Sequence, residues 1–150
     1  MSVRRMYSWE VIEILPLLHK FNEESGYGYP VSDDKLVGWV LNSVLARKMV
    51  VFVQVVNGEI VGVLGGHIAA YTGSEKERAS EAFFYIDPEH RGGLAAVRMM
   101  KGYIDWAWER GMDRCQMTAL SSTDTEGKVR QFYESLGLKL VEQAFEIRKT

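Results

Sequence analysis

Hydrophobic residues recur at helical spacing in four stretches of the chain, and each stretch is bounded by polar residues or glycine. A period near 3.6 residues places these side chains on one face of a helix, which can then pack against a core. Pro16 lies inside the first stretch, where we expect it to kink or divide the helix. The pattern therefore predicts helices over residues 9–18, 34–48, 94–110 and 126–136.

Shorter apolar runs rich in β-branched and aromatic residues predict strands between these helices. Asn57-Gly58 separates two such runs and favours a tight hairpin turn, and residues 22–34 form a polar, glycine-containing loop. The expected strands are residues 50–56, 60–68, 81–87, 114–120 and one or two over 138–147. The predicted order is ααβββαβαβ, an α/β chain with a mixed sheet flanked by helices, and residues 1–150 form a single domain.

Composition narrows the class of protein. The net charge of −2 and the pI near 5.9 argue against a dedicated nucleic-acid-binding protein. Cys115 is the single cysteine, so no internal disulfide can form, and no apolar run approaches the length of a membrane span. We expect a cytoplasmic protein that binds neither nucleic acid nor membrane, with no metal site.

The segment around residues 85–98 has the chemistry of an anion site. A predicted strand leads through Arg91-Gly92-Gly93 into the third helix. The first turn of a helix has unpaired N–H groups, small residues allow a phosphate to approach them, and Arg91 and Arg98 add positive charge. Two interpretations remain open: a diphosphate site, or a tight turn in which the glycines serve geometry alone.

Two segments give the chain its resemblance to a known family. Residues 85–93, Tyr-Ile-Asp-Pro-Glu-His-Arg-Gly-Gly, and residues 132–138, Phe-Tyr-Glu-Ser-Leu-Gly-Leu, resemble the two signatures of the GNAT superfamily of N-acetyltransferases, in the usual order. Leu94 stands where the family has glycine, Ala96 ends the loop, and Glu126 replaces a frequent asparagine. The glycine-poor loop is similar to that of bacteriophage-type members.

The resemblance implies a mostly antiparallel sheet and acetyl-CoA as acyl donor. The family's cofactor loop corresponds to residues 91–96, whose backbone would hold the diphosphate of coenzyme A. The backbone of the preceding strand would bind the pantetheine arm. The implied cofactor-binding residues are Phe84, Tyr85, Ile86, Arg91, Gly92, Gly93, Leu94, Ala95 and Ala96.

Two side chains are candidates for proton transfer. The resemblance makes Tyr133 the general acid that protonates the leaving thiolate; alternatively, its ring packs beside Phe132. Glu81 lies near the position of a family glutamate that accepts the amine proton; alternatively, it is a solvated carboxylate at a strand edge. Glu126 is a second candidate base, although the spacing of Thr123 and Glu126 is typical of a helix capping box.

The acceptor is expected to be an amine, on a small molecule or on a protein, that attacks acetyl-CoA directly in a ternary complex. Residues 21–29 hold two carboxylates and two tyrosines, which would suit a cationic amine. Leu94 and Glu126 leave an alternative open, a non-catalytic module that binds coenzyme A or another protein. Family members are often dimers, so a homodimer is also expected.

Overall fold

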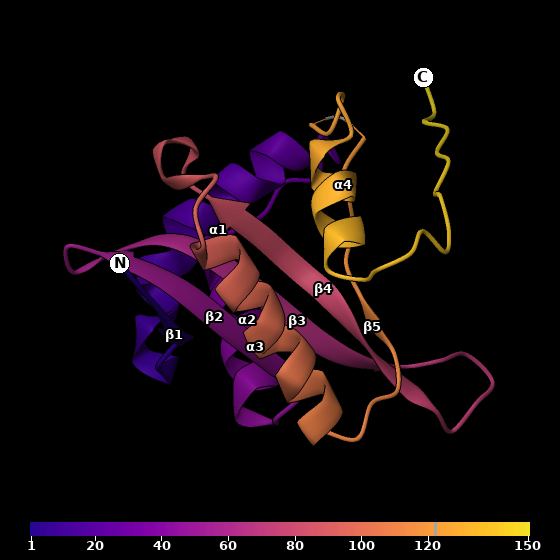
Figure 1. Ribbon diagram of the computed structural model, residues 1–150, viewed down its shortest axis with the longest axis horizontal. Coiled ribbons are helices and arrows are strands. Elements are labelled where there is room, and N and C mark those ends of the chain that lie inside the picture. The colour runs from indigo at the N-terminus through magenta and orange to yellow at the C-terminus, as the bar shows by residue number, and fades with distance from the viewer. Residues whose placement is uncertain (122) are drawn as a thin grey trace. The chain divides into compact units, whose positions relative to one another are not determined.

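The computed structural model describes residues 1–121 and 123–150, and these residues form a five-stranded sheet in the order β1-β2-β3-β4-β5 (Figure 1). The first four strands pair antiparallel and the fifth joins β4 in parallel. Their bounds are β1 Ser2–Arg5, β2 Met49–Val56, β3 Glu59–Ala70, β4 Glu77–Ile86 and β5 Cys115–Gln116. The prediction of a mixed, mostly antiparallel sheet is confirmed.

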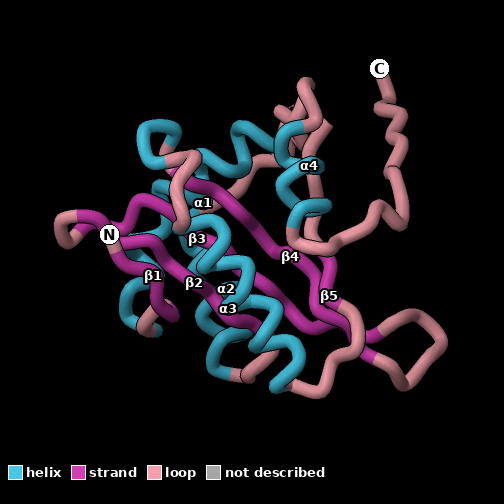
Figure 2. The backbone as a smooth tube through the Cα atoms, in the orientation of Figure 1, coloured by secondary structure: helices cyan, strands magenta, loops and turns pink. Residues whose placement is uncertain are grey.

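Helices cover both faces of this sheet. A 3₁₀ turn η1 (Ser8–Glu10) leads into α1 (Val11–Ser25), which shares one face with α2 (Asp33–Leu45), and α3 (Ala95–Glu109) crosses the opposite face (Figures 1 and 2). Each helix buries its apolar stripe against the strands, as the hydrophobic period predicts.

Of the two effects predicted for Pro16, a kink or a division, division of the first helix is wrong, because α1 continues through it. Proline removes one backbone donor, which leaves the carbonyl of Ile12 without its helical partner. Both Pro16 and Ile12 lie on the exposed side of α1, where water can bond that carbonyl. Position on the helix therefore decides whether this proline is tolerated.

The predicted loop over residues 22–34 is also wrong in its first part. α1 extends to Ser25 and ends at Gly26, whose φ of 71° is the left-handed conformation that closes many helices. Only residues 26–32 connect α1 to α2. Glu23 and Glu24 therefore belong to the last turn of a helix.

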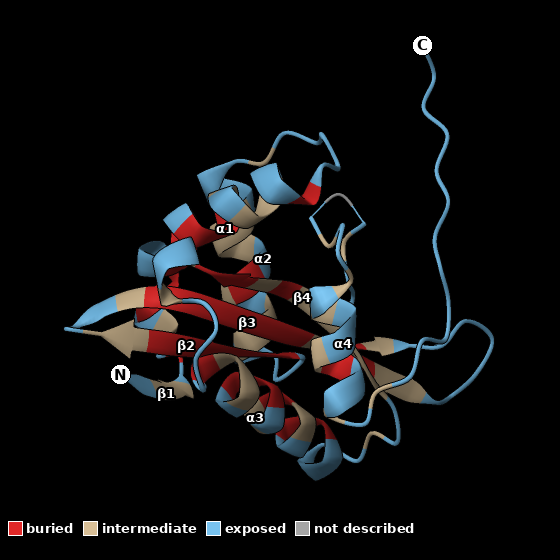
Figure 3. Ribbon diagram, turned by 45° about the horizontal axis from the view of Figure 1, so that its top comes forward, coloured by how far each residue is buried: buried red, intermediate tan, exposed pale blue. Residues whose placement is uncertain are grey.

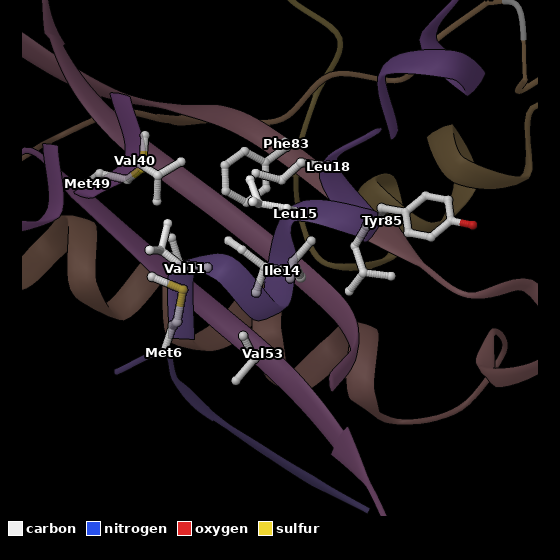
Figure 4. Close-up of a cluster of buried hydrophobic side chains, with 13 residues drawn as sticks. Met6, Val11, Ile14, Leu15, Leu18, Val40, Met49, Val53, Phe83 and Tyr85 are labelled. Carbon is white, nitrogen blue, oxygen red and sulfur yellow. The ribbon is translucent and has the colours of Figure 1, made fainter. Parts of the chain in front are cut away.

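The main core lies between α1, α2 and the sheet. Its buried residues form an apolar cluster that includes Ile14 and Leu18 of α1, Val40 of α2, and Val53 and Phe83 of the strands (Figure 4). The central strands β2, β3 and β4 are buried along much of their length (Figure 3). Each Å² of apolar area buried in this cluster stabilises the fold by about 25 cal/mol.

The predicted β2–β3 hairpin is confirmed. Asn57 and Gly58 form its turn with φ values of 51° and 79°, and positive φ at both central residues is typical of the type I′ turn that suits twisted strands.

The two ends of the chain differ from the predicted element order. A short strand, β1, precedes the first helix and pairs with β2; Arg4 stabilises it by a two-pronged ion pair with the buried carboxylate of Glu10, at 2.7 and 2.8 Å. The strands predicted over 138–147 are absent: these residues pair with no strand of the part of the chain that the structure describes. A β-strand needs a neighbour to satisfy its backbone, and an alternating sequence does not provide one.

The chain divides into two compact units, residues 1–118 and residues 119–150. The first contains the sheet and α1 to α3, and the second contains α4 (Lys128–Ser135) and the exposed C-terminal segment. No helix within the described residues is long and apolar enough to cross a membrane. That the whole chain acts as a single domain stays a prediction.

Candidate active site

The predicted strand–turn–helix segment is present at the end of β4. The chain passes through a 3₁₀ turn η2 (Pro88–His90) and then through residues 91–94, called the glycine turn below, before α3 begins at Ala95. Gly92 has a φ of 87°, a conformation that L side chains rarely adopt. The glycine is therefore required by the backbone itself.

The start of α3 suits an anion. The first hydrogen bond at this helix end runs from Arg98 N to Leu94 O, at 3.0 Å, so the preceding amides have no intrahelical acceptor. Among the described residues no side chain caps the helix, and its first turn has no acidic residue. Leu94, which replaces the family's glycine, is 63% exposed and is not folded into the core. The predicted loop residues thus fit a diphosphate by their backbone.

The Arg91 side chain does not lie over these amides. Its Nε donates to the carbonyl of Ile86 at 2.6 Å, and its guanidinium lies 5.2 Å from the centre of the Tyr85 ring. The same guanidinium pairs with Glu24 of α1 at 3.2 Å. Lys20, one turn earlier on α1, pairs with Asp87 at 3.1 Å. The Arg91 charge expected at the turn is therefore paired with a carboxylate of the protein, and two ion pairs join α1 to this segment.

The edge of β4 provides backbone groups beside the glycine turn. β5 pairs with β4 only at Ala79 and Ser80, and within the described residues no other strand continues this pairing toward residue 86. Along residues 81–86, alternate N–H and C=O groups point away from β3. Phe84, Tyr85 and Ile86 lie on this stretch, where a pantetheine arm could bond to the strand.

Glu81 lies where β5 stops pairing with β4, on the face covered by α3. Gly66 of β3 pairs with Glu81 and Gly65 pairs with Phe83, so Ala82 is an extra residue, a β-bulge. The bulge turns Glu81 to the opposite face from Phe83, although two residues apart they would ordinarily share a face. Sequence alternation alone would have assigned Glu81 to the wrong face.

The environment of Glu81 changes its acidity. Burial disfavours the charged carboxylate and raises the pKa of Glu81 from 4.5 to about 7, while a hydrogen bond from the Thr118 amide, at 3.4 Å, acts in the opposite direction. A carboxyl group with a pKa near neutral pH is half ionised there and can accept a proton from an amine. By accessible surface Glu81 is half-buried, so both interpretations of this carboxyl group, a base and a solvated strand-edge carboxylate, stay predictions.

Tyr103 is not among the site residues that the sequence predicts, although it lies on the same face of the sheet as Glu81. Tyr103 of α3 is fully buried, and its hydroxyl donates to the carbonyl of Gln116 in β5 at 2.9 Å. Its ring occupies the space beside Gly66, where a Cβ would collide with it. The Cys115 thiol lies next to the hydroxyl, and burial raises the pKa of both groups. The pair Gly65-Gly66 inside a strand was the available signal, because glycine there often marks a close approach.

Tyr133 lies in the second compact unit, on α4. Its side chain is 7% exposed, and its ring centre lies 5.9 Å from that of Phe132. The predicted capping box is wrong: the Asp124 carboxylate accepts from Val129 N at 2.9 Å, and Glu126 pairs with Lys128 at 2.9 Å. Its ion pair places Glu126 among surface charges of its own unit.

Comparison with known proteins identifies the family to which the chain is similar. A model of the Acetyltransferase (GNAT) family matches residues 14–138, whereas no curated protein matches the chain.

Three solved structures illustrate the similarity in fold. A predicted acetyltransferase from Clostridium acetobutylicum, solved with acetyl-CoA, has a TM-score of 0.80 at 15% identity, over 98% of this chain and 95% of that one. A ribosomal-protein-alanine N-acetyltransferase from Brucella melitensis biovar Abortus has a TM-score of 0.70 at 18% identity, over 99% and 100%. An aminoglycoside 6'-N-acetyltransferase from Acinetobacter haemolyticus has a TM-score of 0.74 at 14% identity, over 100% and 99%. These comparisons do not bear out the resemblance to bacteriophage-type members.

Proposed function

The chain belongs to the GNAT acetyltransferase family, and from this premise we propose that it transfers the acetyl group of acetyl-CoA to a primary amine by direct attack in a ternary complex. The observation that supports the proposal most is the start of α3, where a glycine turn leads into an uncapped helix with no acid in its first turn. The amides of residues 91–96 bind the diphosphate, and the edge of β4 at Phe84, Tyr85 and Ile86 binds the pantetheine arm.

Acetyl-CoA supplies an acetyl group activated as a thioester, and two side chains move the protons. Glu81 accepts a proton from the attacking amine as the C–N bond forms, since a carboxyl group with a pKa of about 7 is partly ionised at neutral pH. Tyr133 donates its hydroxyl proton to the sulfur as the C–S bond breaks. The products are an N-acetylated amine and free coenzyme A.

Cofactor binding can be tested without any knowledge of the acceptor. Gly92→Ala introduces a side chain at a φ of 87° inside the glycine turn, and Gly73→Ala does so at a φ of 79° in the loop between β3 and β4. Both variants carry a similar backbone strain of about 1–2 kcal/mol. We expect Gly92→Ala to raise the Kd for acetyl-CoA at least tenfold by calorimetry, and Gly73→Ala to leave it unchanged. Wild-type protein that fails to bind acetyl-CoA would contradict the proposal and favour a non-catalytic module.

The role of Tyr133 requires a separate experiment. Tyr133→Phe keeps the buried ring and removes the hydroxyl, so acetyl-CoA should still bind while kcat falls by about 10- to 1000-fold, around the usual contribution of a general acid. Tyr71→Phe, an exposed tyrosine between β3 and β4, is the matched control. The turnover of both variants is measured as the release of free thiol from acetyl-CoA in the presence of a panel of primary amines. Unchanged turnover in Tyr133→Phe would remove Tyr133 from the mechanism.

A further inference from the structure

A small apolar cavity lies between the first two helices and β4. Its volume is about 120 Å³, and it is lined by Leu18 and Phe21 of α1, Val31 of the connecting loop, Leu36 and Trp39 of α2, and Phe83 of β4. Asn22 and the bulge residue Ala82 complete the lining. Leu18 and Phe83, which both line it, lie side by side in the apolar cluster (Figure 4).

The cavity has little capacity for charge. Among the described residues that line it, none is ionisable, and the Asn22 amide already donates to the carbonyl of Tyr29 at 3.0 Å. Neither carboxylate of the predicted acceptor segment lines it: Glu24 pairs with Arg91, and Glu23 is exposed. An ammonium group placed there would lose its water without gaining an opposite charge, which is unfavourable. The expectation that residues 21–29 select a cationic group by charge is not supported by this lining.

The cavity has the dimensions and the surface for one aromatic ring. An apolar cavity of about 150 Å³ in another protein binds benzene. Trp39 is 43% exposed, and its ring meets that of Phe83 edge-on, with centres 6.0 Å apart. A third ring could therefore make both edge and face contacts while covering apolar surface that Trp39 leaves in water.

The cavity shares strand β4 with the proposed base. Ala82 lines it, and Glu81 is the adjacent residue of β4, at about 3.8 Å between Cα atoms. The bulge directs Glu81 to the α3 face, and the cavity opens on the α1–α2 face. β5 pairs with β4 only at Ala79 and Ser80, so an acceptor whose ring lies in the cavity would bring its amine to Glu81 around the edge of β4.

We infer that this cavity holds the side group of the acceptor, and that the acceptor is a small arylalkylamine, a primary amine separated from an aromatic ring by a short linker. The inference rests on the amine acetylation proposed above and names its substrate class. It distinguishes this chain from enzymes whose acceptors carry several amino groups, because those acceptors need carboxylates where this cavity has hydrocarbon.

Two amines of opposite character test the inference, phenethylamine and 1,4-diaminobutane. Burial of a phenyl ring should raise kcat/KM for phenethylamine about 10- to 100-fold above that for 1,4-diaminobutane. Val31→Phe fills the cavity from the loop and should raise the KM for phenethylamine at least tenfold, with the KM for acetyl-CoA unchanged. Val141→Phe, the same substitution at an exposed position, is the control. A preference for 1,4-diaminobutane, or equal effects of the two variants, would overturn the inference.

A binding measurement separates this inference from the proposed function. The indole N–H signal of Trp39, assigned in the NMR spectrum with Trp39→Phe, should shift in a saturable way when phenethylamine is added and stay in place with 1,4-diaminobutane. Such a shift supports the cavity as a ring site even if the protein acetylates no amine tested, an outcome that would count against the proposed function alone. An unchanged Trp39 signal, or the same shift with both amines, overturns the inference.

Discussion

The two faces of the sheet bury different kinds of side chain. Beneath α1 and α2 the buried cluster is almost entirely aliphatic and aromatic, with residues such as Ile14, Val53 and Phe83 in mutual contact. Beneath α3 the strands and the helix also bury the Gln54 side chain and the Tyr103 hydroxyl, and the Glu81 carboxyl is half-buried there. Burial of a polar group costs stability unless it is compensated. Glu10 and Ser25, the buried polar residues at the two ends of α1, are both hydrogen-bonded, whereas the proposed base, Glu81, lies on the α3 face.

Two adjacent glycines show how closely the faces are placed. Gly65 lies against the Phe83 ring on the α1–α2 face, and Gly66 lies against the Tyr103 ring on the α3 face. Both are in β3, opposite the bulge at Ala82. A side chain added at Gly65 would therefore disturb the α1–α2 face, whereas one added at Gly66, the next residue, would disturb the α3 face, where the proposed base lies.

The largest effect should come from the carboxyl group on the α3 face. Glu81→Gln should lower kcat/KM by about 100- to 10,000-fold, the usual contribution of a positioned base, and remove the rise in rate near pH 7. Since the pKa of Glu81 is raised in the folded protein to about 7, its contribution to stability is complete below pH 4.5 and is lost as pH rises through 7. The variant should consequently melt no lower than wild type at pH 8.

Glu77→Gln is the matched control for this experiment. Glu77 begins the same strand and pairs with Lys48 at the surface, at 3.1 Å. It should retain the wild-type rate and pH profile. If Glu77→Gln and Glu81→Gln lowered kcat/KM equally, the α3 face would have no special role.

The second effect, on the α1–α2 face, should be large in stability and small in chemistry. Ile14→Ala empties space in the main cluster, where the side chain is fully buried, and should lower the free energy of unfolding by about 2–5 kcal/mol. Urea denaturation gives this value, and the rise in rate near pH 7 should stay in place. A displaced pH profile would show that the two faces are coupled.

The smallest effect should come from the glycine pair, which gives the sharpest comparison. Gly65→Ala and Gly66→Ala each force a methyl group against a ring and should each cost about 1–3 kcal/mol of stability. Only Gly66→Ala displaces Tyr103. We therefore expect only this variant to change the pH at which the rate increases, which is near 7 in the wild type. Tyr103→Phe, which loses the hydrogen bond to Gln116 and keeps the ring, should move it in the same direction. Identical pH profiles for the two glycine variants would contradict the proposed difference in role between the two faces of the sheet.

Much of the fold was predictable because its elements have strong local signals. The helical periods, the Asn57-Gly58 turn and the glycine turn ahead of α3 depend on residues close together in sequence. The side on which Glu81 lies was not predictable, because the bulge at Ala82 depends on the register with β3. The strands predicted over 138–147 failed for a similar reason, since a strand depends on its neighbour.

The candidate site, like the fold, was predictable only where it depends on residues close together in the sequence. The backbone of the glycine turn follows from local geometry, and the structure has it in the expected form. The partner of the Arg91 guanidinium lies 67 residues earlier in the chain, on α1, and no local pattern identifies it. The Tyr103 hydroxyl likewise bonds a strand that begins beyond the end of its helix.

The contact between Arg91 and Glu24 has a consequence for the response of the protein to ionic strength. Before any anion arrives, the arginine already has a counter-ion within the protein, and a diphosphate that takes over Arg91 would break its ion pair with Glu24. One ion pair replaces another on binding. Added salt therefore weakens the Arg91–Glu24 pair of the free protein as well as the contact between Arg91 and the bound diphosphate. Affinity for an anionic ligand should then vary with salt less steeply than the positive charges near the turn would suggest, and neutralising Glu24 should make that dependence steeper.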